Sequence, residues 1–328
     1  MIFSRLQFAQ AQSNRRRQVI MSLAALAVLL VGAGELGVHR LLAQREQQAP
    51  HTPTTDVLQR VGPRQYALFL GDSVPYGYQP TGDWTHGYAD DWTAEMQRRH
   101  PKLIQINMGC YFETTATMLA GGCPGPTTYH VPLKYDVSTG QPGSATTYAP
   151  YPGQLAAALA FIAAHTGAVS PVVIDLGLND LVACYDPMTG MNATCARQAL
   201  VSERDDLKFI VASVKAALHG AGDVIVPTTY DPLQNVDPST IPWVDQRGCA
   251  NPWVLPCSVN SNAVAVASQQ HVFLADEAEG VFHTNSYPTG NNPAICKLTH
   301  MCDASPDTHP NTSGYAAIAA YLQRLMGY

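Results

Sequence analysis

The chain has 328 residues, of which 46% are hydrophobic and 13% are charged, and its formal net charge is −6. This length is ample for one large domain with a substantial hydrophobic core. Because no basic stripe follows the first fifty residues, nucleic acid is excluded as an expected partner.

The N-terminal region has the pattern of an export signal. Arg5 and the arginines at 15–17 precede an apolar stretch that runs from Val19 to Gly34, and a charged region followed by an apolar one is typical of exported chains. We therefore predict that residues 1–43 are either a cleaved signal peptide or an uncleaved membrane anchor, and the sequence leaves both open.

The same arginines predict where the rest of the chain lies. Positive charges before an apolar segment stay in the cytoplasm, so the protein is expected to be secreted or anchored to the outer face of the cytoplasmic membrane, with residues 19–42 as the membrane contact. Residues 44–62 are polar and rich in Pro and Thr, which predicts a linker. Residues 63–328 are predicted to form one domain.

The order of elements in residues 63–328 predicts the fold. Short apolar runs bounded by turn residues are expected strands: 66–70, 103–107, 172–176, 224–226 and 272–274. Expected helices cover 87–100, 154–165 and 198–219 with Gly220 as a cap, a last helix begins near Ser313, and residues 121–152 are an expected long loop. Strands that alternate with helices predict an α/β protein with a mainly parallel five-stranded sheet that is covered by helices on both sides.

The eight cysteines fall into four local pairs. An even number of cysteines in an exported chain indicates disulfides, and pairing between sequence neighbours is the simplest connectivity. No Cys-x-x-Cys pair is present, and no metal site is expected. The predicted pairs are Cys110 with Cys123, Cys184 with Cys195, Cys249 with Cys257, and Cys296 with Cys302.

Polar residues follow two of the predicted strands and precede the last helix. Residues 71–73 (Gly-Asp-Ser) follow the first strand, residues 177–180 (Gly-Leu-Asn-Asp) follow the third, and residues 307–311 (Asp-Thr-His-Pro-Asn) precede the helix. Ligands meet an open parallel sheet at the carboxyl ends of its strands. Serine, asparagine and histidine side chains are therefore expected at that edge.

These residue types suit nucleophilic catalysis. A serine hydroxyl becomes a good nucleophile beside a base that takes its proton, and a histidine base needs an acceptor on its other ring nitrogen. Asp307 lies two residues before His309, and Pro310 favours an extended conformation for His309, in which residues two apart project to the same side. Asn179 offers a side-chain N–H donor of the kind that stabilises an oxyanion.

Taken together, these residues resemble the SGNH (GDSL-type) hydrolase family of esterases and lipases. The resemblance runs from about Tyr66 to the C-terminus and rests on four blocks: residues 69–73 (Phe-Leu-Gly-Asp-Ser), 107–114 (Asn-Met-Gly-Cys-Tyr-Phe-Glu-Thr), 177–180 and 307–311. It implies a three-layer α/β/α sandwich of flavodoxin-like type, in agreement with the mainly parallel five-stranded sheet expected from the order of elements. It also implies Ser73 as the nucleophile, His309 as the base, and Asn179 as an oxyanion-hole donor beside the Ser73 backbone N–H.

The sequence differs from the family pattern in two places. The second block usually supplies a glycine whose N–H joins the oxyanion hole, and the best alignment places Phe112 there, with Gly109 as the fallback. The acid usually lies three residues before the histidine, where this chain has Pro306. Asp307 is the predicted acid, and a backbone carbonyl is the alternative acceptor.

The resemblance implies a serine esterase that hydrolyses carboxylic esters, of short-chain or lipid type, through an acyl-enzyme and without a cofactor. The N-terminal pattern predicts that this esterase is extracytoplasmic. The expected partner is the small-molecule or lipid ester itself, and we expect a monomer. Two alternatives stay open. One is a carbohydrate acetylesterase, and the other is a catalytically silent ligand-binding domain of the same fold.

Overall fold

The computed structural model describes residues 58–328, apart from 247–248, 250 and 254–255. The predicted signal or anchor segment, residues 1–43, and residues 44–57 of the predicted linker lie outside the described residues. Within the described part of the chain, no helix is long and apolar enough to cross a membrane.

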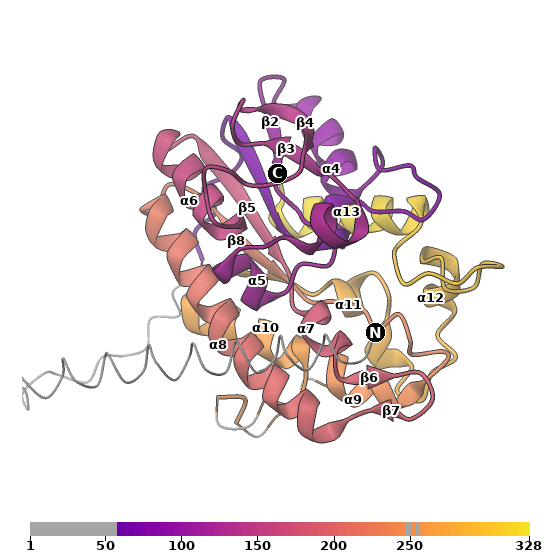
Figure 1. The fold of residues 1–328 in the computed structure, drawn as a ribbon. Helices are drawn as coiled ribbons and strands as arrows, with labels where there is room; N and C mark the ends of the chain where they lie inside the picture. Colours follow the sequence, from indigo (N-terminus) through magenta and orange to yellow (C-terminus); the bar gives the residue numbers. More distant parts are fainter. Residues whose placement is uncertain (1–57, 247–248, 250, 254–255) are drawn as a thin grey trace, which may run out of the picture. The chain divides into compact units, whose positions relative to one another are not determined.

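The centre of the domain is a five-stranded sheet (Figure 1). Its strands are β1 (Tyr66–Gly71), β2 (Ile104–Asn107), β5 (Val169–Asp175), β8 (Val224–Pro227) and β9 (Phe273–Ala275), in the spatial order β2-β1-β5-β8-β9. All neighbouring pairs are parallel. Among the sheet's own strands this is the order 2-1-3-4-5, the flavodoxin-like one, so the predicted parallel sheet is confirmed.

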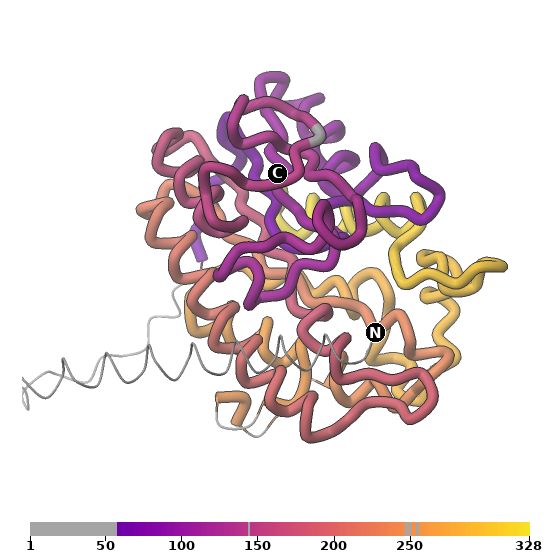
Figure 2. The backbone as a smooth tube through the Cα atoms, viewed as in Figure 1, coloured from indigo at the N-terminus to yellow at the C-terminus, as the bar shows by residue number. Residues whose placement is uncertain are grey.

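Helices cover both faces of this sheet. One face packs against α6 (Gln154–Ala164), α8 (Ala193–Leu218) and α10 (Val259–Gln270), and the other against α4 (Tyr88–Gln97) and α13 (Thr312–Met326). Helices α4 and α13 are in contact, and Figure 2 shows the first and last parts of the described chain close together. The predicted three-layer sandwich is confirmed.

The strand residues divide between the two faces as the β pleat requires, because successive side chains point to opposite sides. Leu68 and Leu70 of β1 belong to the core under α6 and α8, whereas Ala67 and Phe69 belong to the core under α4 and α13. All four are fully buried. A strand covered on both faces therefore reads as a continuous apolar run.

Shorter elements occupy the connections. The short helices are α3 (Ser73–Tyr76), α5 (Thr115–Ala120), α7 (Leu178–Val182), α9 (Ile241–Val244), α11 (Glu277–Gly280) and α12 (Pro293–Leu298), with η1 (Gly125–Tyr129), η2 (Pro238–Thr240) and η3 (Thr284–Ser286). Two hairpins pair β3 (Leu133–Asp136) with β4 (Gln141–Ala145), and β6 (Tyr185–Asp186) with β7 (Gly190–Met191).

The prediction of one long loop over residues 121–152 is wrong, since this region holds the π-helix η1 and the β3–β4 hairpin. Leu133 and Tyr135 are buried while Lys134 between them is only partly buried. That alternation is the usual signal of a half-buried strand, but only three or four residues carry it among many turn-forming ones.

Helix α8 begins five residues before the predicted residue 198. The Asn192 side chain accepts the backbone N–H groups of Thr194 and Cys195 at 3.1 and 3.0 Å, and a side chain that satisfies the first free N–H groups lets a helix start there. At the other end the capping residue is His219, in a left-handed conformation, one residue before the predicted Gly220.

The last residues of the predicted linker belong to the folded domain. Val61 and Gly62 donate their backbone N–H groups to the Asp223 carboxylate at 2.9 Å each. The Arg60 guanidinium donates to the Leu325 carbonyl oxygen at 2.8 Å. The folded part therefore begins a few residues before the predicted boundary at 63, because partners far away in the sequence hold this segment.

The structure forms the four disulfides that the sequence predicted, each between sequence neighbours: Cys110–Cys123, Cys184–Cys195, Cys249–Cys257 and Cys296–Cys302. They close loops whose ends are 6 to 13 residues apart. In the chain-entropy picture, each restricts the unfolded chain and stabilises the folded one by roughly 2–3 kcal/mol.

Candidate active site

The carboxyl ends of β1 and β5 lie side by side near the middle of the sheet. The chain runs from β1 to β2 on one side and then crosses to β5 on the other, and in an open α/β sheet such a reversal leaves a crevice where ligands bind. Ser73 directly follows the turn after β1, and Asn179 follows β5. Both predicted site residues therefore lie at this reversal.

The turn that presents Ser73 is held on both sides. The Asp72 side chain accepts the Val74 N–H at 2.9 Å and so caps α3. Gly71 has a φ of +132°, and a Cβ atom there would lie 1.8 Å from the Asp175 carbonyl oxygen. Only glycine combines this conformation with such a close approach of two strands. The Gly-Asp-Ser sequence thus holds the hydroxyl at the strand end.

A chain of hydrogen bonds joins Ser73, His309 and Asp307. The Nε2 atom of His309 lies 2.7 Å from the Ser73 Oγ atom, and its Nδ1 atom lies 2.6 Å from the Asp307 Oδ1 atom. The same Oδ1 atom accepts the His309 backbone N–H at 2.9 Å. Among the described residues, Asp307 is the only hydrogen-bond partner of Nδ1, and the alternative backbone carbonyl is not found there.

The protonation of Asp307 depends on its neighbour. Burial would raise the pKa of this carboxyl, but the hydrogen bonds and charge of His309 outweigh burial and hold the pKa below its ordinary value. Since an aspartate pKa is ordinarily about 3.9, Asp307 is ionised at neutral pH. An ionised acceptor keeps a proton on Nδ1 and leaves Nε2 free to accept one from the serine.

The segment that carries His309 is fastened to the rest of the domain. The His300 N–H donates to the His309 carbonyl oxygen at 3.0 Å, and the Tyr230 hydroxyl donates to the Thr308 carbonyl oxygen at 2.7 Å. The Cys296–Cys302 disulfide closes the loop just before this segment. The imidazole is therefore positioned by backbone contacts on both sides of its residue.

Two of the predicted oxyanion donors, the backbone N–H groups of Ser73 and Phe112, belong to residues that line one cavity. Among the described residues, neither N–H has a hydrogen-bond partner. Phe112 has a φ of +69°, a left-handed conformation that costs a non-glycine residue roughly 1–2 kcal/mol. Phe112 thus adopts the backbone conformation that a glycine would take most easily, and its N–H is left unpaired.

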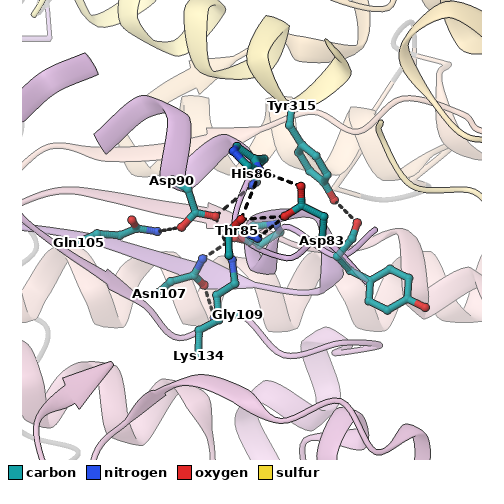
Figure 3. Close-up of polar contacts among 12 residues, drawn as sticks. Asp83, Thr85, His86, Asp90, Gln105, Asn107, Gly109, Lys134 and Tyr315 are labelled. Atoms are coloured by element: carbon teal, nitrogen blue, oxygen red, sulfur yellow. Dashed lines mark hydrogen bonds and ion pairs between the residues drawn. The ribbon is translucent and has the colours of Figure 1, made fainter. Parts of the chain in front are cut away.

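The fallback donor, Gly109, is engaged elsewhere. Its N–H donates to the Asn107 Oδ1 atom at 3.0 Å, as Figure 3 shows, and the Asn107 amide donates to the Pro75 carbonyl oxygen at 2.7 Å. A Cβ atom at Gly109 would lie 2.8 Å from the Tyr76 backbone nitrogen. Gly109 therefore allows this loop to pack closely against α3, and its N–H is not free to act as the fallback oxyanion donor.

The Asn179 side chain is held by two acceptors. Its Nδ2 atom donates to the Glu113 carbonyl oxygen at 3.0 Å and to the Asp72 Oδ2 atom at 3.2 Å. An amide nitrogen has two protons, so both are engaged in this structure, and Asn179 can donate to an oxyanion only by giving up one of these two bonds. Asp180 has a separate structural contact, accepting the N–H and hydroxyl of Thr115 at 3.1 and 2.6 Å.

Replacing Asn179 with alanine is expected to lower kcat for ester hydrolysis by roughly 10²–10³, the usual effect of losing one oxyanion donor. The measurement is steady-state kinetics with p-nitrophenyl butyrate, with Asn285→Ala at an exposed position as the control. An unchanged kcat with a raised KM would mean that Asn179 binds the substrate instead.

A buried network that the sequence did not reveal joins the Ser73 turn to the Phe112 loop. Gln154, the first residue of α6, is fully buried. Its Oε1 atom accepts the Gly71 N–H at 2.6 Å, and its Nε2 atom donates to the Gly71 carbonyl oxygen at 2.9 Å and to the Glu113 Oε2 atom at 3.1 Å. A glutamine at the start of a helix carries no sequence signal for such a contact.

Burial also changes the titration of Glu113. It raises the pKa of this carboxyl to about 7, although hydrogen bonds from Thr117 and Gln154 act in the opposite direction. A group whose pKa is higher in the folded than in the unfolded chain contributes stability that is present below its ordinary pKa and is lost as the pH rises through the folded value. Glu113 therefore favours folding at acidic pH, and this contribution is gone above pH 7.

The variant Glu113→Gln removes this titration. Between pH 4.5 and pH 8, the free energy of unfolding of the parent is expected to fall further than that of the variant, by roughly 2–3 kcal/mol. Urea unfolding at both pH values tests this, with Glu95→Gln in a surface ion pair as the matched control. An equal pH dependence in Glu113→Gln and the parent would contradict the buried titration.

A cavity of about 330 Å³ adjoins Ser73 and His309. It extends from these residues toward α7, the β6–β7 hairpin and α9, which gather on one side of the domain (Figure 1). The apolar residues of that part of its wall are Leu178, Leu181, Val182, Met191, Leu233 and Val244.

One group of potential metal ligands occurs among the described residues. Atoms of Cys110, Glu113 and Cys123 lie within 4.8 Å of one another. The two sulfurs are bonded to each other, so neither is the thiolate that metals bind. This group is therefore part of the disulfide-closed loop and does not fit a metal.

No family model matches the sequence, and no curated protein matches it. Among solved structures, the chain is similar to a member of the lipolytic G-D-S-L family from Veillonella parvula, with 14% identity, 79% of this chain and 96% of that chain covered, and a TM-score of 0.43. It is similar to TesA, with 16% identity, coverage of 79% and 97%, and a TM-score of 0.42.

A third similar structure is the psychrotrophic esterase EstA from Pseudoalteromonas sp., with 13% identity, 80% of this chain and 97% of that chain covered, and a TM-score of 0.40.

Proposed function

We propose that the protein is an extracytoplasmic serine esterase of the SGNH type that hydrolyses carboxylic esters through an acyl-enzyme. The hydrogen-bonded chain from Ser73 through His309 to Asp307 carries this proposal. Its distances are those of a nucleophile, a base within hydrogen-bond reach, and a group that orients the base. A silent binding domain would have no need of this alignment.

In the first step His309 accepts the Ser73 proton at Nε2 while Oγ attacks the ester carbonyl. Negative charge then develops on the carbonyl oxygen. The N–H groups of Ser73 and Phe112, with the Asn179 amide, are the donors that would stabilise this charge. His309 next gives its proton to the alcohol oxygen, the carbon–oxygen bond to the alcohol breaks, and an ester of Ser73 is left.

In the second step water takes the place of the alcohol. His309 accepts a proton from this water, which attacks the Ser73 ester, and then returns the proton to Oγ as the acid leaves. Asp307, ionised throughout, stabilises the imidazolium that forms in both steps. All the proton transfers therefore pass through one ring nitrogen, Nε2.

The extracytoplasmic location belongs to the same proposal. Four disulfides fit an extracellular protein, and the arginine-led apolar N-terminus has the pattern of an export segment. A fusion of residues 1–62 to a reporter enzyme active only outside the cytoplasm tests the location. A reporter that stays inactive would contradict it.

The activity is tested by covalent labelling and turnover on the same sample. A fluorophosphonate probe is expected to label Ser73, identified by peptide mass spectrometry, and the protein is expected to hydrolyse p-nitrophenyl esters. A chain that neither reacts with the probe nor hydrolyses any ester would instead be a binding domain. Turnover confined to acetylated sugars would favour the carbohydrate acetylesterase.

A further inference from the structure

We propose that the cavity beside Ser73 is the acyl subsite, and that the substrates are esters of medium-chain fatty acids with about six to ten carbon atoms. This inference rests on the proposed esterase function and adds to it the class of acyl group. Four features of the site carry it: the position of His309, the chemistry of the cavity wall, the pairing of its polar groups, and its volume.

The position of His309 decides which half of the ester enters the cavity. Because Nε2 gives its proton to the leaving alcohol, the alcohol oxygen lies on the His309 side of the tetrahedral carbon. The rings of Tyr78 and Tyr111, whose centroids lie 4.7 and 5.8 Å from the His309 ring, lie on that side, and Tyr111 lines the end of the cavity nearest His309. With the oxyanion directed at its donors, the acyl chain is left to point toward α7 and α9.

Aliphatic side chains form much of the wall in that direction, beside the polar side chains of Asp231 and Thr240. Leu181 and Val244 are only 2% and 3% exposed and line the cavity together with Leu178, Val182 and Met191. Among the residues that the structure describes, no lysine or arginine lines the cavity, so this described wall offers no cationic group to an acidic acyl group. An alkyl chain is the occupant that such a surface stabilises, because burial removes apolar area of both partners from water.

Two polar side chains of the same wall, Thr240 and Asp231, are hydrogen-bonded to each other. The Thr240 hydroxyl donates to the Asp231 Oδ2 atom at 2.6 Å, and the Asp231 Oδ1 atom accepts the Leu233 N–H at 2.9 Å. A sugar placed here would bury hydroxyl groups beside partners that are engaged, which is unfavourable. The cavity therefore suits a chain without polar groups.

The volume sets the length of the chain. A water molecule occupies about 30 Å³ in the liquid, and a methylene group is of similar size. The cavity of about 330 Å³ also includes the space around Ser73 and His309, so roughly ten such groups is the upper limit for the chain. An acetyl group would leave most of this space unfilled. Each further methylene buried is expected to raise kcat/KM roughly fourfold, until the cavity is full.

Two isomeric esters test the assignment. Ethyl octanoate and octyl acetate have the same atoms, but the long chain is the acyl group in the first and the alcohol in the second. The parent is expected to prefer ethyl octanoate. Val244→Phe, which shortens the cavity, is expected to lower the ratio of kcat/KM for ethyl octanoate over octyl acetate by at least about tenfold.

The control is Val201→Phe, the same substitution at a position on α8 that is 37% exposed and outside the cavity; it should leave the ratio unchanged. Val244→Ala, which lengthens the cavity, should move the preferred acyl group to longer chains. This variant provides the test if Val244→Phe does not fold. A loss confined to octyl acetate, or an unchanged preference in both Val244 variants, would overturn the assignment.

Failure of this inference can be told apart from failure of the proposed function. A parent that hydrolyses p-nitrophenyl acetate but prefers ethyl acetate to ethyl octanoate remains an esterase, and only the medium-chain subsite is then wrong. A parent that hydrolyses no ester and leaves Ser73 unlabelled by the fluorophosphonate contradicts the esterase function itself.

Discussion

Replacing Ser73 with alanine is expected to reduce kcat for p-nitrophenyl butyrate hydrolysis by about 10⁶-fold, the scale seen when the nucleophile of a serine hydrolase is removed. The physical reason is that no other group can form the acyl-enzyme, so His309 would have to activate water directly. The oxyanion donors remain in place and account for whatever turnover is left.

The fold should survive this change, because the Ser73 hydroxyl has a single hydrogen-bond partner among the described residues, His309. The unfolding midpoint in urea should therefore stay close to that of the parent. Ser213→Ala, which removes a hydroxyl from the exposed side of α8, is the control and should keep full activity. Turnover within tenfold of the parent would exclude Ser73 as the nucleophile.

Replacing Asp307 with asparagine is expected to lower kcat by a factor approaching 10⁴, as in other Ser-His-Asp sites. The carboxylate accepts two N–H groups of His309, at 2.6 and 2.9 Å. A neutral amide cannot stabilise the imidazolium by charge, and with its NH₂ group toward the ring it would favour the wrong tautomer. The loss should appear in kcat for every ester, whatever its chain length.

The same loop offers a matched control for this substitution. Asp303 contacts the Nδ1 atom of His300 at 2.6 Å, so it forms a second aspartate–histidine pair, but its side chain is 56% exposed. Asp303→Asn should leave kcat within about twofold of the parent, since surface pairs contribute little. A loss below tenfold in Asp307→Asn would mean that another acceptor orients His309.

Much of the fold and of the candidate site was predictable from the sequence because the features involved are local. A strand covered on both faces is a short apolar run wherever it occurs, and the five runs found here became the five strands of the sheet. The spacing of two residues between Asp307 and His309 was visible in the sequence, but the expected extended conformation is replaced by a bend at 308–309, in which the Asp307 Oδ1 atom also accepts the His309 backbone N–H. Cysteines close in sequence need only a short loop to meet.

The tertiary structure decided what depends on residues far apart in the chain. The left-handed Phe112, the engaged N–H of Gly109 and the Gln154 side chain that joins Gly71 to Glu113 all depend on how loops from different strands pack. A backbone N–H looks the same in every sequence, so its availability as a donor is settled only by what folds against it.

Contacts between distant residues also explain why the cavity, and the packing of residues 61–62 of the linker against the domain, were not predicted from the sequence. The cavity wall combines α7, the β6–β7 hairpin, the segment after β8 and α9, none of which has an apolar pattern that sets it apart from core. Val61 and Gly62 join the domain only because Asp223 lies beside them. The sequence by itself determined the strands, their order along the chain and the residue types at their ends. Packing determined which of those groups are free to meet a substrate, since each distant contact depends on all the others.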